Sequence, residues 1–219
     1  MHIGSFQTIE SGSTGLYKEK GSKFLAYAYP IDDESAVKIH LEKLKKEHPK
    51  ARHHCFAFRL LPDGRLYRAN DDGEPSGTAG KPILGQLLSY NLTDVLVVVV
   101  RYFGGTKLGA SGLIQAYKAA ARDALEQASI CTRIVTQKFH IAFPFAVAGE
   151  VMQALSRNQV TILNENYTSE GQIAFSIPVT ESGTILHHLK SQLAGFDGED
   201  AAMDDVLVEK EIKIYPPGN

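Results

Sequence analysis

The stretch KFHIAFPFAVAGEVMQALSRN, residues 138–158, joins a strand pattern directly to a helix pattern. Apolar side chains alternate along residues 138–143, as expected for a strand with one buried face. Pro144 ends this pattern and suits the start of a helix. Apolar residues then recur at helical spacing from Val147 to Leu155, and Asn158 stands at the expected exit.

The rest of the C-terminal half continues the alternation of elements. Residues 160–167 and 172–179 are predicted to form a hairpin of two strands. Ser182 is expected to cap a second helix, which Gly195 ends. Residues 206–214 alternate as a final strand. The resulting β-α-β-β-α-β order is that of a ferredoxin-like domain, a fold that serves many functions.

The N-terminal half begins with a predicted hairpin of residues 16–20 and 23–29 around Gly21. A helix follows, capped by Asp32 or Asp33 and ended by Pro49. Later segments have the patterns of two strands joined by a tight turn, a short helix, a buried strand and a long helix. We assign these elements to residues 54–60, 65–68, 83–89, 94–102 and 110–128.

Two glycine-rich loops precede the last two helices of this half. The first glycine-rich loop is residues 70–82, and the second is residues 104–109. A helix N-terminus carries unsatisfied N–H donors and partial positive charge, so each loop suits an anion. Tight turns with close strand–helix packing are the alternative explanation. Neither loop has the spacing of a P-loop or a dinucleotide-binding fingerprint.

Composition excludes several classes of protein. The chain has 219 residues, of which 43% are hydrophobic and 22% charged, close to the globular average. No apolar run approaches the ~20 residues of a membrane helix, and the start MHIGSFQTIE lacks a signal-peptide pattern. The two cysteines, Cys55 and Cys131, cannot form a disulfide framework or a cysteine-based zinc site. We expect a cytoplasmic protein without a membrane partner.

Charge divides the chain unevenly. Residues 1–135 carry 18 Lys and Arg against 14 Asp and Glu, a net charge of +4, whereas residues 136–219 carry 5 against 11, a net charge of −6. No low-complexity linker separates the halves. We therefore predict two domains, residues 1–135 and 136–219, joined by a short connection. A basic first domain favours an anionic partner, with an ordinary solvated surface as the alternative.

Metal and catalytic patterns are weak. His53 and His54 are adjacent on a predicted strand and point to opposite faces, so they cannot chelate one ion together. Cys55 fits a buried core position better than a nucleophile. The acidic residues Asp71, Asp72 and Glu74 fit a solvated loop better than a divalent-cation site beside a substrate phosphate. We expect no metal, no cofactor and no catalytic residues.

Three segments carry a family resemblance: ARHHCFAFR at residues 51–59, DGEPSGTAGKPIL at residues 72–84 and VVVRYFGGTKLG at residues 98–109. Together they resemble the hallmark motifs of the IMPACT family. The resemblance covers residues 14–130, and the remainder is similar to the extra C-terminal domain of bacterial members. Ser111 departs from the glycine that many relatives carry.

The resemblance implies an N-terminal domain like the second domain of ribosomal protein S-five, a β-α-β fold with a left-handed crossover. The tandem of domains resembles domains four and five of elongation factor G, which implies association with the ribosome. Eukaryotic relatives regulate translation by competing for the activator of a starvation-responsive initiation-factor kinase. Bacteria lack that kinase circuit, so its partner does not carry over. The family provides no established catalytic residues.

The predicted fold class is α+β, with an S-five-like domain followed by a ferredoxin-like domain. The predicted function is that of a translation-linked regulatory protein that binds RNA or the ribosome. A protein-interaction regulator is one alternative. A small-molecule phosphate-handling enzyme is the other, because residues 108–113 loosely resemble the phosphate-loop helix start of small-molecule kinases. No acidic base is evident for such an enzyme.

The expected nucleic-acid or anion site combines cations with glycines that let a phosphate approach the backbone. Its residues are Arg101, Lys107, Lys81, Gly104, Gly105 and Gly109, with Glu74, Ser76 and Thr78 as loop partners. We expect the two glycine-rich loops to lie side by side. In the alternative, Arg101 pairs with Glu74 and holds the loops together.

Overall fold

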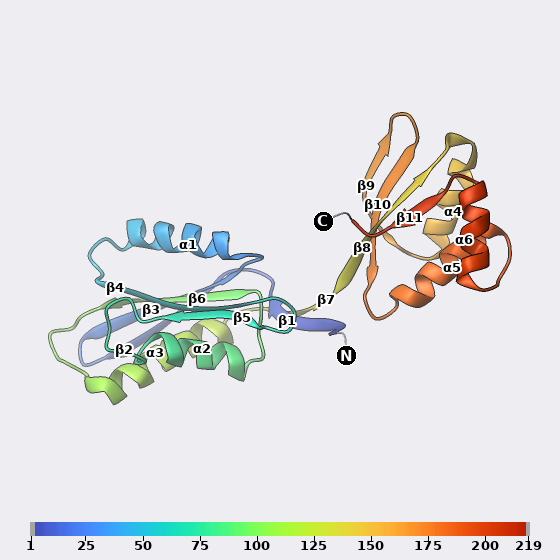
Figure 1. The fold of residues 1–219 in the computed structure, drawn as a ribbon. Coiled ribbons are helices and arrows are strands. Elements are labelled where there is room, and N and C mark those ends of the chain that lie inside the picture. Colours follow the sequence, from blue (N-terminus) through green and yellow to red (C-terminus); the bar gives the residue numbers. More distant parts are fainter. Residues whose placement is uncertain (1–2, 218–219) are drawn as a thin grey trace. The chain divides into compact units, whose positions relative to one another are not determined.

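The computed structural model describes residues 3–217 and divides into two compact units. Ser5–Arg133 form the N-terminal unit, and residues 134–217 together with residues 3–4 form the C-terminal unit. Each unit is a β-sheet with helices packed on it (Figure 1). The predicted α+β class with two sheet-containing regions is confirmed.

A five-stranded antiparallel sheet forms the centre of the N-terminal unit. Strands β3 and β4 both pair antiparallel with β6, so they run parallel to each other on either side of it. Helix α1 (Glu34–Glu47) connects them, which makes a β-α-β crossover around a middle strand. The sheet order is β2 (Ser13–Glu19), β3 (Ser22–Pro30), β6 (Val95–Tyr102), β4 (His53–Leu60) and β5 (Leu66–Asn70). The left-handedness of the crossover stays a prediction.

Strand β6 is apolar on both faces because both faces of the sheet are covered. Val97 and Val99 lie in one core, and Val98 and Val100 lie in the other. Figure 1 shows α1 on one face of the sheet and α2 (Gly80–Ser89) with α3 (Gly109–Glu126) on the opposite face. The cap of α1 is the side chain of Asp33, which accepts from the backbone N–H groups of the first turn.

The junction between the two halves holds strands that the sequence pattern did not indicate. Strand β1 (Ser5–Ile9) pairs with β7 (Ile130–Ile134) in a two-stranded sheet, and β8 (Thr136–Phe143) follows immediately. Neither β1 nor β7 alternates clearly: β7 is exposed on nearly every residue, and the buried residues of β1, Thr8 and Ile9, are adjacent. The short connection expected between residues 135 and 136 therefore lies between two strands, with Val135 alone separating them.

The C-terminal unit has the ferredoxin-like strand order. Its four antiparallel strands are β11 (Lys213–Tyr215), β8, β10 (Gly171–Pro178) and β9 (Thr161–Tyr167), in that spatial order. A single 3-10 turn (Phe145–Val147) precedes α4 (Ala148–Arg157), and α5 (Ser182–Ala194) and α6 (Asp200–Glu209) complete the helical layer. One apolar core lies between this layer and the sheet.

Two details of the C-terminal prediction are wrong. Residues 206–209 belong to helix α6, and the last strand is only Lys213–Tyr215. Met203 and Leu207, one helical turn apart, are the buried residues of α6, whereas Val208 is 72% exposed. The apparent alternation of valines therefore did not reflect burial. Ser182 is also not the cap of α5, since its hydroxyl donates to the Val179 carbonyl oxygen.

We expect residues 136–219 to fold alone, because the core of this unit contains only residues from Phe139 onward. Expressed by itself, the fragment should unfold in a single cooperative urea transition followed by far-ultraviolet circular dichroism. A matched fragment beginning at Ile134 would retain Val135, which donates its N–H to Gly4 and accepts from Val179 in the whole chain. A broad, non-cooperative transition in both fragments would contradict the prediction.

Candidate functional site

The two glycine-rich loops leave the N-terminal sheet at the same end of its strands. Strand register pairs Arg101, near the end of β6, with His53 at the start of β4. It also pairs Asn70, the last residue of β5, with Phe56 in the same part of β4. Glu74 of the first loop contacts Arg101, which leads into the second loop. Both loops therefore leave the same end of the sheet, and their lying side by side stays a prediction.

Arg101 and Glu74 form a buried ion pair. The Arg101 Nη1 donates to Glu74 Oε1 at 2.6 Å, and the Tyr117 hydroxyl donates to the same oxygen at 2.7 Å. Arg101 is only 7% exposed. Its assignment as a surface phosphate ligand is therefore corrected: the guanidinium is committed to an internal carboxylate. The alternative considered from the sequence, a pair that holds the loops together, is what the structure contains.

Cys55 belongs to this buried network. Its thiol lies 3.0 Å from the Asp71 carbonyl oxygen and 3.3 Å from the Tyr117 hydroxyl. Burial is the main cause that raises the pKa of Cys55 above its ordinary value. A protonated, fully buried thiol is a poor nucleophile, so the geometry favours the core role expected for Cys55.

The first glycine-rich loop supplies its own anion. The carboxylate of Asp71 accepts three backbone N–H groups, from Gly77 at 2.9 Å, Ala79 at 3.0 Å and Gly80 at 2.8 Å. These donors begin helix α2, whose cap residue Ala79 provides no side-chain acceptor. The expectation that they face an external phosphate is wrong, because an internal carboxylate already occupies this helix N-terminus.

Hydrogen bonding also sets the ionisation of Asp71. Burial alone would raise its pKa, but the bonds from Gly77, Gly80 and Ala79 outweigh burial and lower the pKa below its ordinary value.

The neighbouring loop residues have internal roles or face solvent. Thr78 is buried and donates its hydroxyl to the Pro75 carbonyl oxygen at 2.6 Å, whereas Ser76 is exposed.

The second glycine-rich loop is shaped by close packing. A β-carbon on Gly104 would collide with the backbone of Gly21 and Ser22, and the Gly104 N–H donates to the Ser22 hydroxyl at 3.1 Å. Gly105 and Gly109 have φ angles of +87° and +71°, a region that favours glycine. Helix α3 starts at Gly109 without a capping side chain. The first N–H groups of α3 therefore lack a capping side chain, whereas N–H groups at the start of α2 donate to the Asp71 carboxylate.

A pocket of about 640 Å³ opens beside the second loop, and we call it the basic pocket. Four of its lining residues are permanent cations, and none is a carboxylate. The lining residues are Lys50, Arg52, His53, Arg101, Tyr102, Phe103 and Lys107. Lys107 lines this pocket, whereas Lys81 does not.

Two residues of the basic pocket were not found from the sequence. Lys50 and Arg52 both precede β4, and although Arg52 lies in the motif of residues 51–59, neither residue was assigned to the site from the sequence. The pairing of His53 with Arg101 brings this segment to the end of β6. Only knowledge of that register would have linked these cations to Lys107.

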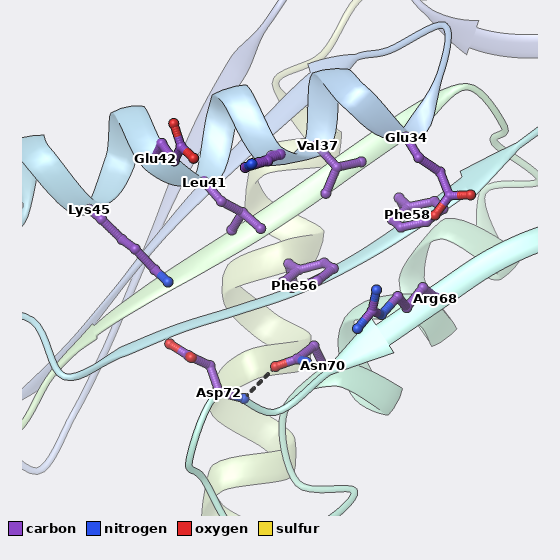
Figure 2. Close-up of a pocket in the computed structure, with 11 residues that line it drawn as sticks. Glu34, Val37, Leu41, Glu42, Lys45, Phe56, Phe58, Arg68, Asn70 and Asp72 are labelled. Carbon is purple, nitrogen blue, oxygen red and sulfur yellow. Dashed lines mark hydrogen bonds between the residues drawn. The ribbon is translucent and has the colours of Figure 1, made fainter.

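A second pocket of about 460 Å³ lies between α1 and the strands β4 and β5 (Figure 2). Its floor is apolar, with Val37, Leu41, Phe56 and Phe58. Its rim carries three acidic and three basic side chains: Glu34, Glu42, Asp72, Lys38, Lys45 and Arg68. Balanced charge gives this pocket no preference for a polyanion.

Residues 3–217 contain no cluster of three or more histidine, cysteine or acidic side chains placed to hold a metal ion. Within the same residues, no helix has the length and apolar character needed to cross a membrane.

Residues 20–125 match the family model described as the Impact N-terminal domain. The chain is 35% identical to the IMPACT family member YvyE of Bacillus subtilis over 179 residues, which cover 82% of this chain and 81% of that protein. The chain belongs to the IMPACT family. Its resemblance to bacterial YigZ-type members holds as well, with 32% identity to YigZ of Escherichia coli over 74% of this chain and 80% of that protein.

One solved structure has a similar fold over the whole chain. A crystal structure described only as that of a hypothetical protein matches all of this chain and all of its own, with a TM-score of 0.71 and 26% identity. The structure of the two-domain translational regulator Yih1 is 25% identical over 56% of this chain and 47% of its own. Its TM-score of 0.34 is too low to support a shared arrangement.

We expect Glu74→Leu to destabilise the N-terminal unit by about 3–5 kcal/mol, because Arg101 would remain buried without its carboxylate. The double variant Glu74→Leu with Arg101→Leu should recover most of that loss. Amide hydrogen exchange of β6 in the intact chain measures the effect on this unit alone. Glu47→Gln, which breaks an exposed pair with Lys43, is the control and should cost less than about 0.5 kcal/mol.

Asp71→Asn should destabilise the N-terminal unit by about 2 kcal/mol at pH 7, because its carboxylate accepts three N–H groups at a helix start. The lowered pKa means that this stabilisation is complete above the ordinary value of 3.8 and is lost as pH falls through the folded-state pKa. Unfolding free energies of wild type and variant should therefore converge below pH 3.8. A difference that stays constant with pH would disprove the role of the charge.

Proposed function

We propose that this IMPACT-family protein regulates translation by binding RNA, free or within the ribosome, through the basic pocket. The observation that carries the proposal is the lining of that pocket, in which Lys50, Arg52, Arg101 and Lys107 occur with no carboxylate. The whole chain has a formal net charge of −2. A local concentration of cations on such a chain is the electrostatic footprint of a phosphate-bearing partner.

Lys50, Arg52 and Lys107 can contact a phosphate, whereas Arg101 is already paired with a buried carboxylate. The charge of Arg101 is offset by Glu74 at 2.6 Å. Lys107 is exposed in the second loop, and Lys50 and Arg52 lie outside any strand or helix just before β4. We therefore assign phosphate contact to Lys50, Arg52 and Lys107. Arg101 lines the pocket but makes no phosphate contact in this proposal.

Family membership supports the link to translation. The N-terminal unit matches the domain that gives the family its name, and the Saccharomyces cerevisiae protein called an IMPACT homolog aligns over 96 residues at 34% identity. A catalytic reading has less support. The basic pocket offers no carboxylate as a general base, and the nearby Cys55 thiol is buried with a raised pKa.

A protein-interaction regulator is the second candidate, and the pocket under α1 favours it. Its apolar floor and its rim of both charges suit a polypeptide better than a nucleic acid (Figure 2). Binding of a protein to such a surface should depend weakly on salt. Binding of RNA to the basic pocket should depend on it strongly.

We expect binding of an unstructured RNA to weaken linearly with the logarithm of salt concentration. Lys107→Gln and Arg52→Gln should each reduce the slope by about 1, because each removes one phosphate contact. Lys38→Gln, on the rim of the pocket under α1, is the matched control and should leave the slope unchanged. Fluorescence anisotropy over a series of salt concentrations gives the slopes.

The position of Lys81 makes it a further test of the binding surface. Lys81 is exposed at the start of α2 but does not line the basic pocket. A reduced slope in Lys81→Gln would extend the RNA surface to the first loop, as the sequence suggested. Wild-type slopes in both Lys107→Gln and Arg52→Gln would refute the proposed function.

A further inference from the structure

Phe103 is an exposed aromatic residue among the cations of the basic pocket. It follows β6 directly and is 58% exposed, although the adjoining residues of β6 are buried or half-buried. Both Phe103 and the cations Lys50, Arg52 and Lys107 line the same pocket. Removing this apolar ring from water would be favourable, so its exposure indicates a contact surface.

Arg101 supports the ring of Phe103 from one side. The guanidinium carbon lies 5.6 Å from the centroid of Phe103 and 5.4 Å from that of Phe24, over both rings. Glu74 holds the same guanidinium by a 2.6 Å bond. Cation–π contact therefore orients Phe103 on a rigid base. Arg101 lies over the ring, and the 58% exposure of Phe103 leaves area for a further contact.

The backbone on either side of Phe103 is also anchored. Tyr102 before it pairs with Lys23 of β3. Gly104 after it packs against Gly21 and donates its N–H to the Ser22 hydroxyl. The ring is thus held in place before any ligand arrives, which lowers the entropic cost of a contact with its exposed area.

We propose that Phe103 is a stacking platform for one unpaired nucleobase, and that Lys50, Arg52 and Lys107 neutralise the phosphates on either side of that nucleotide. This inference rests on the proposed function and specifies its ligand as single-stranded RNA. A protein stacks a base only where the face of that base is accessible, and duplex pairing buries both faces. An aromatic ring combined with a cationic groove is the usual arrangement for binding single strands.

The size of the basic pocket agrees with this ligand class. A volume of about 640 Å³ lies within the range of roughly 300–1,000 Å³ of small-molecule sites. That space accommodates a base with its sugar and phosphate. His53 fixes one wall, because its Nδ1 lies 2.8 Å from the Asp72 carbonyl oxygen.

The test compares an unstructured labelled RNA of about 12 nucleotides with its blunt duplex, using the full chain and fluorescence anisotropy. Phe103→Leu keeps an apolar side chain but removes the aromatic face, and it should weaken binding of the single strand at least about five-fold. Phe103→Tyr should restore it. Tyr67→Leu is the matched control, because Tyr67 is 61% exposed on β5 and does not line the pocket.

The salt slope separates the two proposals. Phe103→Leu should leave the slope unchanged, because stacking releases no counterions, whereas Lys107→Gln should reduce it. Equal affinity of Phe103→Leu and wild type, or tighter binding of the duplex, would overturn the stacking role and leave RNA binding intact. Failure of wild type to bind either RNA would overturn the proposed function itself. Unchanged hydrogen exchange of β6 in Phe103→Leu confirms that the fold is retained.

Discussion

The buried carboxylate of Glu74 is the contact on which the arrangement of the N-terminal unit's loop edge depends. It accepts hydrogen bonds from Arg101 of β6 and from Tyr117 of α3, while it belongs itself to the first glycine-rich loop. Three elements distant in sequence therefore meet at one oxygen. A charge buried in this way must be compensated, since an unpaired partner would cost several kcal/mol. The pair consequently restricts the loop to one position.

A second carboxylate in the same loop determines which helix start remains available. Asp71 satisfies the first N–H groups of α2 from within the chain, whereas α3 begins without a side-chain cap. Internal carboxylates thus occupy the first loop, whereas Lys107 of the second loop lines the basic pocket. The two glycine-rich loops look equivalent in composition but differ in which of their helix N–H groups are already bonded within the chain.

In the proposed function, Arg101 serves the binding surface without touching the ligand. Its charge is paired with that of Glu74, and its planar guanidinium lies over the rings of Phe24 and Phe103. The ion pair with Glu74 stabilises the fold, and the contact with Phe103 orients an exposed aromatic ring. The same guanidinium therefore contacts both the Glu74 carboxylate of the first loop and the Phe103 ring.

Local pattern alone determined much of this protein. Apolar periodicity identified most helices and strands, including β6, and the motif of residues 98–109 indicated the family. Periodicity failed at α6, where valine alternation did not match burial, and it carried no signal for β1 and β7. The tertiary structure alone decided the site: strand register brought Lys50 and Arg52 beside Lys107, and burial separated Arg101 from solvent. Sequence records which groups are charged, but pairing and desolvation depend on neighbours that only the folded chain assembles.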